Sequence, residues 1–299
     1  MMKVLVIGGS YFLGRVFVMF AHEKFDLTLI NRGTYSMKSF GVKEYILDRH
    51  EEKALSDIDH DFDVIVDFCA YQQGDIAKIV EYMKGSVKQY IMVSTVDVYQ
   101  RQTGVIKDET HPLETRRFGG NIGTYIDQKI LLENELIKQS RMHHFHYTIL
   151  RPGMIYGPYN YAPRESELIK RIANHLPLVS LTDANASFQL VYVKDVALAI
   201  IQCIEKKAYD CIYNVINPQL LNYDSINHLF QSITNIDILL LNSSQAQSTG
   251  YPLPFPIFKT EEELYNGEKI CQELDFHYTS FEDGMTKTLQ ATLPIYQQK

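Results

Sequence analysis

A short apolar run near the start of the chain leads directly into a glycine-rich turn and then into a helical segment, and this order constrains the fold more than any other feature. Lys3–Ile7 has the composition of a strand, the turn G-G-S-Y-F-L-G follows it, and Leu13–His22 has helical spacing. Glycines at such a turn let backbone N–H groups approach a pyrophosphate at the positive end of the helix. We therefore predict a dinucleotide site, although a turn that serves only helix-sheet packing has the same glycines. The expected cofactor-binding residues of the turn are Gly8, Ser10, Tyr11, Phe12, Leu13 and Gly14.

Similar apolar runs rich in β-branched residues recur through the first half of the chain, with helical segments between most of them. Strands that are almost continuously hydrophobic and alternate with helices indicate a parallel sheet covered on both faces. We therefore predict an α/β fold built on a doubly wound parallel sheet of the Rossmann type. The expected strands after the first are Leu27–Ile30, Glu44–Leu47, Val64–Phe68, Tyr90–Val93 and Tyr147–Leu150, and the expected helices after the first are Ile76–Tyr82 and Tyr125–Ile137.

The amino-acid composition changes after Gly157, where prolines and Asn/Ser-rich loops become frequent. We predict an NAD(P)-binding Rossmann domain over residues 1–157 and a smaller C-terminal α/β domain, mainly substrate-binding, over residues 158–299. A strand-and-helix unit at Gln189–Ile204 and a strand at Ile212–Val215 should return to the first domain, so about 189–216 is assigned to its sheet. Helices are expected near Asp224–Gln231 and Phe281–Leu289.

The charge balance argues against a nucleic-acid partner. The 299 residues carry a net charge of −7, and no run of Lys and Arg could form a basic stripe against a phosphate backbone. The four cysteines are scattered without ligand spacing, and no segment has the apolar length of a signal-peptide core or a membrane span. We expect free thiols, a cytoplasmic protein without membrane contact, and a small-molecule substrate as its partner. A homodimer is left open.

Three histidines close together, His143, His144 and His146, raise the question of a metal site. They lie just before the sixth expected strand, in a helix-to-strand connection without carboxylates nearby. Metal sites in proteins need a fuller set of ligands. We therefore interpret these histidines as a solvated loop and expect no metal.

The end of the second expected strand indicates which dinucleotide is bound. An acid at this point would favour NAD through the ribose, but the chain has Asn31 and Arg32. Because a guanidinium matches a phosphate in a bidentate fork, Arg32 favours NADP slightly over NAD, with a solvated loop arginine as the alternative. Asp48 and Arg49, past the third strand, are assigned to the same site. Asp48 could accept from the adenine amino group or cap the next helix.

A second motif places acid-base chemistry on a helix. Tyr125 and Lys129 are four residues apart, so the phenol and the ammonium share one helix face. A nearby positive charge lowers the pKa of a phenol, and such a tyrosine can exchange a proton with a substrate hydroxyl while hydride moves to or from a nicotinamide. The same spacing occurs by chance in amphipathic helices. Its weight here comes from its place after a strand that ends in Ser94 and Thr95.

Taken in order, these segments resemble the extended short-chain dehydrogenase/reductase superfamily, also called the NAD-dependent epimerase/dehydratase family. The resemblance covers nearly the whole chain. Besides the glycine-rich turn, it rests on C-A-Y at Cys69–Tyr71, VSTVDVY at Val93–Tyr99, DETHPL at Asp108–Leu113, YIDQK at Tyr125–Lys129, LRPGMIYGP at Leu150–Pro158 and VYVKDVA at Val191–Ala197.

The resemblance implies a role for each residue of the catalytic set. Thr95 would bond the reacting substrate oxygen, Tyr125 would be the general acid/base, and Lys129 would activate Tyr125 and anchor the nicotinamide ribose. Ala70 and Tyr71 would flank the cofactor near the nicotinamide. Asp97 stands where dehydratases and decarboxylases of the superfamily hold a catalytic Glu, so it is a second acid/base candidate, or a loop carboxylate that accepts backbone N–H groups.

Three departures from the family pattern bear on the ligands. Tyr11 replaces the middle glycine of the turn, which is similar to an atypical subgroup. Met154 and Phe188 stand where nucleotide-sugar epimerases often have an Asn and an Arg that hold the substrate pyrophosphate. Arg164 or Lys170, which follow Pro158, are candidate replacement cations.

Two functions follow from these features. The first is an NAD(P)-dependent oxidoreductase or epimerase that acts on a sugar-like substrate, including nucleotide sugars, or on another hydroxyl or carbonyl compound. The alternative is a non-catalytic NAD(P)-binding regulator or an RNA-associated atypical member of the superfamily.

Overall fold

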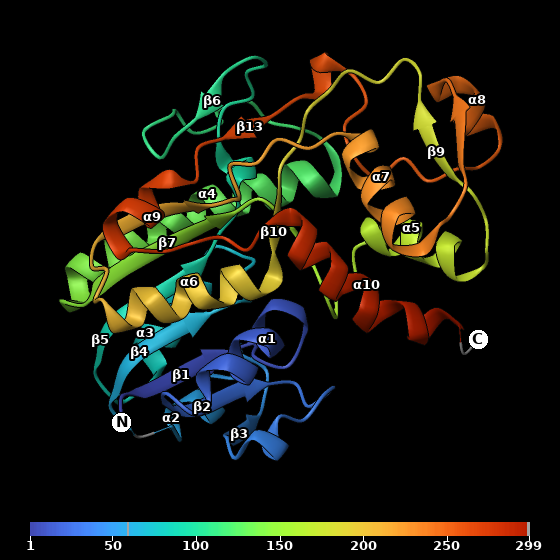
Figure 1. Cartoon of the computed structure of the whole chain (residues 1–299). Coiled ribbons are helices and arrows are strands. Elements are labelled where there is room, and N and C mark those ends of the chain that lie inside the picture. The colour runs from blue at the N-terminus through green and yellow to red at the C-terminus, as the bar shows by residue number, and fades with distance from the viewer. Residues whose placement is uncertain (59, 298–299) are drawn as a thin grey trace.

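A seven-stranded parallel sheet forms the centre of the molecule, in the order β11-β7-β5-β4-β1-β2-β3 (Figure 1). The computed structural model describes residues 1–58 and 60–297. The first strand lies inside the sheet, and the chain order runs outward from it in both directions, so the predicted doubly wound parallel sheet is confirmed. The strands are β1 (Lys3–Ile7), β2 (Asp26–Asn31), β3 (Lys43–Ile46), β4 (Phe62–Asp67), β5 (Val87–Val93), β7 (His146–Pro152) and β11 (Cys211–Val215).

Both faces of the sheet are covered except at the edge strand β3, which has no buried residue, and this burial explains why strands such as β1 are almost continuously apolar. Along β1, Val4 and Val6 belong to one hydrophobic cluster, and Leu5 and Ile7 belong to the other. Helices α1 (Phe12–Ala21) and α6 (Val193–Glu205) pack on the first face, and α2 (Glu52–Ser56), α3 (Asp75–Tyr82) and α4 (Gly120–His143) pack on the second.

Residues 189–216 were expected to return to the central sheet, and only the last strand of this segment does so. The β11 strand pairs with β7, as expected, but β10 (Leu190–Tyr192) lies outside the central sheet and pairs with β8 (Met154–Tyr156). The reason is that β7 ends at Pro152 and the chain continues past Gly153 as β8, which gives β10 a separate partner. Helix α4 is also longer than expected, because its first turn and its last turns lack a clear apolar stripe.

Most of the remaining elements cover the carboxyl ends of the sheet strands and form a smaller α/β layer beside them (Figure 1). The exceptions are η1, which lies between β2 and β3, and α9, which packs on β11 and α6. In this layer β9 pairs with β12, α5 packs against α10, and β13 pairs with β6. The two helices expected here correspond to α7 and α10. The elements are η1 (Lys38–Phe40), η2 (Val96–Val98), β6 (Ile106–Lys107), α5 (Glu165–Ala173), β9 (Leu178–Leu181), α7 (Tyr223–Thr234), β12 (Ile238–Leu241), α8 (Ser243–Ser248), η3 (Lys259–Glu261), β13 (Leu264–Tyr265), α9 (Glu268–Leu274) and α10 (Phe281–Gln297). None of the described helices has the length and apolarity needed to span a membrane.

The interpretation of the histidine cluster as a solvated loop without carboxylates needs correction. His143 ends α4, His144 caps it in the left-handed conformation, and His146 begins β7. The ring of His146 bonds the carboxylate of Asp210 at 2.7 Å and stacks on Tyr209. Asp210 was not visible as a partner because it is brought in by the turn before β11. Within the described residues, no three His, Cys, Asp or Glu side chains gather as a metal site, and all four cysteines are free thiols.

Candidate functional site

A cavity of about 1160 Å³ opens at the carboxyl ends of the sheet strands, between the Rossmann half and the C-terminal layer. Parallel α/β sheets bind ligands at this edge. The cavity brings together all but one of the residues predicted for the site, and the exception is Ala70, which is fully buried behind the wall. Those that line it are Gly8, Ser10, Tyr11, Phe12, Leu13, Gly14, Asn31, Arg32, Asp48, Arg49, Tyr71, Thr95, Asp97, Tyr125 and Lys129.

The glycine-rich turn has no room for side chains at two of its glycines. Gly8 has a φ of +88°, and a Cβ there would lie 2.9 Å from the Cys69 sulfur. A Cβ on Gly14 would lie 2.5 Å from the Gly8 carbonyl oxygen, so α1 can pack this closely only because Gly14 has none. The turn thus leaves the backbone at the start of α1 open to the cavity, which is the geometry that a pyrophosphate requires.

The end of β2 presents a free cation to the same cavity. Asn31 is fixed in place, because its side chain donates to Glu44 at 3.2 Å and accepts from the Gly33 N–H at 2.7 Å. The neighbouring Arg32 is exposed at the cavity wall, and among residues 1–58 and 60–297 no carboxylate lies within 4.0 Å of its guanidinium. A 2′-phosphate would therefore meet an unpaired guanidinium here.

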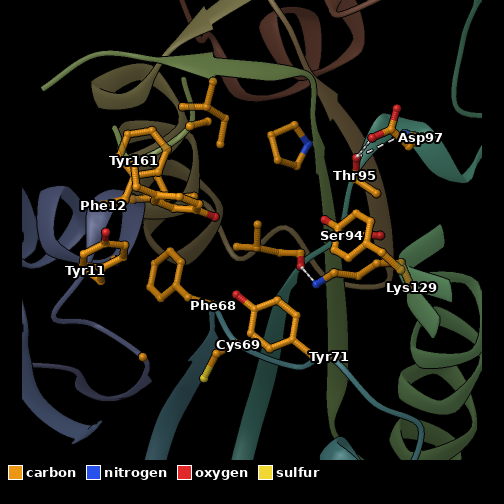
Figure 2. A pocket seen from close by; sticks show the side chains of 18 of the residues that line it. Tyr11, Phe12, Phe68, Cys69, Tyr71, Ser94, Thr95, Asp97, Lys129 and Tyr161 are labelled. Carbon is orange, nitrogen blue, oxygen red and sulfur yellow. Dashed lines mark hydrogen bonds between the residues drawn. The ribbon is translucent and has the colours of Figure 1, made fainter. Parts of the chain in front are cut away.

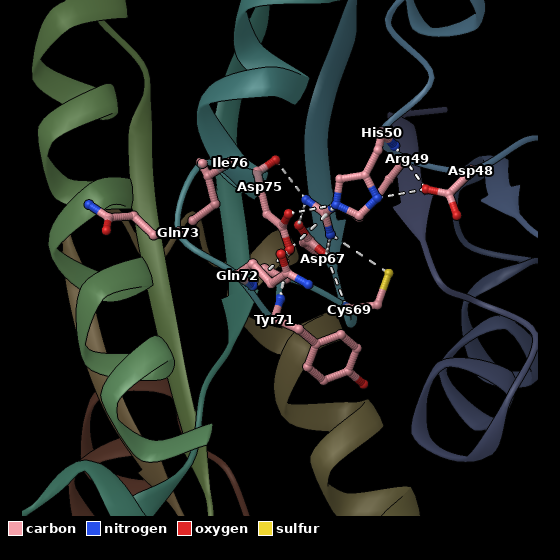
Figure 3. A network of polar contacts seen from close by, with 12 residues as sticks. Asp48, Arg49, His50, Asp67, Cys69, Tyr71, Gln72, Gln73, Asp75 and Ile76 are labelled. Carbon is pink, nitrogen blue, oxygen red and sulfur yellow. Dashed lines mark hydrogen bonds and ion pairs between the residues drawn. The ribbon is translucent and has the colours of Figure 1, made fainter. Parts of the chain in front are cut away.

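Asp48, past the end of β3, belongs to a polar network that borders the cavity (Figure 3). One of its oxygens accepts from the backbone N–H and the ring of His50, at 3.0 and 2.7 Å, and these bonds lower the pKa of Asp48. The other ring nitrogen of His50 bonds Asp75 at 2.9 Å. Helix α2 begins after Glu51 instead, so the alternative that Asp48 caps this helix is not what the structure shows.

Arg49 is committed to a buried ion pair rather than left free for a ligand (Figure 3). Its guanidinium makes two bonds of 2.9 Å to the carboxylate of Asp67 and a third of 2.8 Å to the Asp75 carbonyl. Asp67 also accepts from the Tyr90 hydroxyl at 2.7 Å and from the Cys69 N–H. Arg49 therefore fixes the segment after β4, which carries Ala70 and Tyr71, and touches the cavity only with part of its side chain.

Thr95 and Asp97 follow the end of β5: Thr95 is the N-cap of η2, and Asp97 lies within η2. The Thr95 hydroxyl donates to the Asp97 carboxylate at 3.1 Å and accepts from the Asp97 N–H at 3.2 Å (Figure 2). The alternative of a loop carboxylate that accepts backbone N–H groups is therefore wrong: within the described residues the Asp97 carboxylate accepts from the Thr95 hydroxyl and from no backbone N–H, and Asp97 lines the cavity. One lone pair of the Thr95 oxygen stays available for a substrate hydroxyl.

The structure corrects one expectation about Tyr125. Its pKa is raised, chiefly by burial and then by the negative charge of Asp97, whereas the proximity of Lys129 was expected to lower it. The reason is the direction of the ammonium: Nζ of Lys129 donates to the carbonyl of Ala70 at 2.9 Å. It also donates to the carbonyl of Val93 at 2.8 Å, and Figure 2 draws this second bond. The ammonium lies 5.8 Å from the centre of the Tyr125 ring. Only one of its three N–H groups is left for the phenol or a ribose.

Lys129 is itself strongly perturbed. Its side chain is 2% exposed, and burial lowers its pKa to about 8. The ammonium also lies 5.2 Å from the centre of the Tyr71 ring. A buried cation with a lowered pKa in a cavity is typical of a functional lysine.

A buried polar network, which was not predicted from the sequence, holds helix α4 in place behind this site. One turn after Lys129, Glu133 accepts from the Ser94 hydroxyl at 2.6 Å and pairs with Arg151 at 3.0 and 2.5 Å. Arg151 donates on to the Tyr99 hydroxyl at 2.8 Å. Helix α4 is thereby tied to the residue next to Thr95. The spacing of Lys129 and Glu133 was the available signal, since residues four apart share a helix face.

The wall opposite the glycine-rich turn contains both apolar and charged groups. Met154 and Phe188 line it, and Phe188 stacks on Phe255 at 4.6 Å. Of the two candidate cations, Arg164 lines the cavity, whereas Lys170 does not and is bound to Glu167 at 2.5 Å.

Arg101 is a further cation on this wall that was not expected from the sequence. Its guanidinium lies over the Phe118 ring at 5.3 Å, and no carboxylate within the described part of the chain pairs with it. The nearby Glu263 is instead paired with the buried Lys107. This wall of the cavity therefore carries the guanidinium groups of Arg101 and Arg164, neither of which forms an ion pair with a carboxylate of residues 1–58 or 60–297; Arg164 donates to the Ile155 carbonyl at 3.5 Å.

Comparison with known proteins gives a consistent picture. The sequence profile of the NAD dependent epimerase/dehydratase family matches residues 4–216. The chain is 25% identical over 246 residues to the chloroplast stem-loop binding protein of 41 kDa b from Arabidopsis thaliana, a match that covers 75% of this chain but only 61% of that protein.

Solved structures share the fold over almost the full chain. UDP-glucose 4-epimerase from Thermotoga maritima, determined with UDP-glucose, has a TM-score of 0.77 at 18% identity, covering 98% of this chain and 99% of its own. UDP-glucuronic acid 4-epimerase from Bacillus cereus, in complex with NAD, has a TM-score of 0.73 at 18% identity, covering 99% and 100%. At such identities the likeness establishes the fold alone.

Proposed function

The chain belongs to the NAD dependent epimerase/dehydratase family, and on that basis we propose that it is an NAD(P)-dependent enzyme that oxidises or epimerises a hydroxyl-bearing, sugar-like substrate. The observation that carries this proposal is that a single cavity is lined by the glycine-rich turn and by Thr95, Tyr125 and Lys129. The domain assignment is part of it: residues 1–157 and β11 hold the cofactor, and most of residues 158–299 hold the substrate.

The residues of the cavity divide the chemistry among them. A dinucleotide held by the glycine-rich turn and Arg32 supplies the hydride acceptor and donor. Tyr125 removes the hydroxyl proton through its phenol oxygen as the alcohol is oxidised, and returns it when the carbonyl is reduced. Thr95 orients the substrate oxygen, Lys129 stabilises negative charge on the phenol with its remaining N–H, and Asp97 is the second acid/base.

The test is a turnover assay on the cofactor-loaded protein. Protein loaded with NAD or NADP is incubated with sugars, polyols and nucleotide sugars, the absorbance of reduced nicotinamide reports oxidation, and NMR of the substrate reports epimerisation. We expect turnover with at least one hydroxylated compound. Failure of the wild-type protein to bind either dinucleotide would contradict the proposal.

The choice between the two dinucleotides rests on Arg32. Arg32→Ala should weaken NADP binding by about 1.5–3 kcal/mol, the value of a charge-assisted contact, and leave NAD nearly unchanged. Calorimetric titration of both cofactors measures this, with Arg141→Ala as a matched control, since Arg141 is exposed near the end of α4 away from the cavity. Equal losses for NAD and NADP would show that Arg32 does not contact the 2′-phosphate.

The substrate preference follows from the wall at Met154 and Phe188. A diphosphate placed against these side chains loses hydration without gaining charge-assisted bonds, each worth about 1.5–3 kcal/mol. We therefore expect UDP- and dTDP-sugars to bind weakly in calorimetry on cofactor-loaded protein. Micromolar binding of one of them would contradict this, and Arg101→Ala and Arg164→Ala would then show which guanidinium holds the anion.

A second candidate function is favoured by one comparison. The similarity to a chloroplast stem-loop binding protein supports a non-catalytic, NAD(P)-binding and RNA-associated role. Against it stand the net charge of −7 and a cavity that retains the full Thr95, Tyr125 and Lys129 set. Cofactor binding without turnover on any compound, together with RNA stem-loop binding that persists at physiological salt, would favour this second role.

A further inference from the structure

A row of three tyrosine rings crosses the mouth of the cavity at the glycine-rich turn. Tyr11, at the position of the missing middle glycine, stacks on Tyr35 at 5.8 Å with an interplanar angle of 13°. On its other side it contacts Tyr161 at 5.3 Å and 30°, and Phe12 meets the edge of the Tyr161 ring at 5.7 Å (Figure 2). All four side chains line the cavity.

The row joins segments from both halves of the molecule. Tyr11 lies between β1 and α1, and Tyr35 follows β2, so both belong to the cofactor half. Tyr161 belongs to the connection between β8 and α5 on the substrate side. The contact between Tyr11 and Tyr161 could not be predicted from the residues around either tyrosine, because the two are separated by half of the chain.

The connection that carries Tyr161 is anchored on both sides of the ring. The side chain of Asn160 donates to the buried carboxylate of Glu165 at 2.9 Å and accepts from the Ala162 N–H at 3.0 Å. Glu165 also accepts from the Gly157 N–H at 3.0 Å. Tyr161 is therefore presented by a fixed loop, although its own ring is 65% exposed.

Tyr125 and Tyr71 line the same cavity as the three tyrosines of the row, and both have a raised pKa. Burial is the main cause of the raised pKa of Tyr125, and Tyr161 is among the neighbouring groups that add to it, after Asp97 and Tyr71. The same holds for Tyr71, whose pKa is raised to about 12 by burial, by Cys69 and by Tyr161.

We infer that Tyr35, Tyr11 and Tyr161 form an aromatic bridge that keeps the dinucleotide bound through successive turnovers. The inference rests on the proposed function, since it assumes that the glycine-rich turn holds NAD(P). Release of the cofactor requires the bridge to open, and each pair of rings that must separate slows release by up to about 10-fold.

Retention of the cofactor bears on the reaction class. An enzyme that does not exchange its dinucleotide must reoxidise it in place, and the route that needs no second substrate is to return the hydride to the molecule from which it came. The alcohol then loses one hydride and one proton and regains both, so its net oxidation state is unchanged and no external reductant is needed. The aromatic bridge therefore favours an epimerase cycle over a reductase that exchanges cofactor at every turnover.

The rate of cofactor release tests the bridge directly. Wild-type protein is loaded with labelled NAD or NADP, an excess of unlabelled cofactor is added, and the release of label is followed over time. The variants are Tyr161→Ala, Tyr11→Gly and the double variant, with Tyr161→Leu to keep apolar bulk without a ring. Tyr159→Ala is the matched control, because its ring lies in the same loop over the Arg15 guanidinium at 4.6 Å and does not line the cavity.

We expect each single variant to release cofactor about 10-fold faster, and the double variant to be no faster than the faster single one, because both changes break the same central contact. The Tyr159→Ala control should match the wild type. Unchanged release in Tyr161→Ala and Tyr161→Leu, or effects of Tyr11 and Tyr161 that multiply independently, would refute the bridge. Absence of any dinucleotide binding to the wild type would instead refute the proposed function and the bridge with it.

Discussion

Tyr125→Phe should retain the fold and the affinity for NAD(P) but lose turnover by about 100- to 10,000-fold, the usual contribution of a general acid/base. The change removes one hydroxyl from a side chain of helix α4 and leaves its ring in place. Since burial and Asp97 raise the pKa of this phenol, Tyr125 is protonated at neutral pH. To accept a substrate proton it must first become a phenolate, and a contact with a cation such as Lys129 would stabilise that phenolate. Oxidation should therefore accelerate as pH rises through the alkaline range.

Steady-state turnover and cofactor titration measured on the same preparation separate the two effects. Tyr159→Phe is the matched control, since it removes a hydroxyl from an exposed tyrosine that does not line the cavity. Wild-type turnover in Tyr125→Phe would transfer the acid/base role to another group, with Asp97 as the first candidate. Loss of cofactor binding along with turnover would show that Tyr125 is needed for the shape of the site.

Lys129→Met should lose both turnover and cofactor affinity, and should also change how stability depends on pH. The ammonium is buried, and its pKa falls from 10.5 in the unfolded chain to about 8 in the folded protein. Between these values the unfolded chain binds more protons, so the contribution of this group to the free energy of unfolding rises with pH. Each unit of pKa difference corresponds to about 1.4 kcal/mol in the free energy of unfolding. The stability supplied by the neutral amine is fully present above pH 10.5, and about 3 kcal/mol of it is lost as the pH falls from 10.5 through 8.

Chemical denaturation of the wild type and of Lys129→Met at several pH values isolates this group, because the other titrating residues are common to both proteins. The stability difference between wild type and variant should increase between pH 8 and pH 10.5. Lys129→Arg is the companion variant: it keeps a cation that stays charged over this range, so it should not reproduce the slope. A pH-independent difference would mean that Lys129 keeps an ordinary pKa in the folded protein.

The sheet could be predicted because strands that are buried on both faces have runs of apolar residues that are visible in the local sequence. Strand β1 is apolar at every position after Lys3, β4 has the apolar run Val64–Val66, and helices such as α1 carry apolar stripes. Helix α4 was predicted only in its middle, since its ends are polar. The separate pairing of β10 with β8 could not be foreseen, because a strand's partner is decided by the bend at Gly153 and not by its own residues.

The site was predictable where its chemistry lies in local motifs, and not where it depends on contacts between distant segments. The glycine-rich turn and the spacing of Tyr125 and Lys129 are visible in the sequence itself. The spacing did not show that the protons of Lys129 point to main-chain carbonyls, so the expected effect on the pKa of Tyr125 had the wrong sign. Pairings such as Glu133 with Arg151 join residues 18 apart across the fold.

The buried chain from Ser94 through Glu133 and Arg151 to Tyr99 has a consequence for local motion. Tyr99 donates further to Asn214 of β11 at 2.6 Å, so the network links helix α4 to strands β7 and β11 and to Ser94, which follows β5. Partial detachment of α4 would leave one ion of the Glu133–Arg151 pair unpaired in an apolar interior, which costs several kcal/mol. Fraying of this helix is thereby confined to its exposed ends, and the turn that carries Lys129 opens only when the whole sheet does.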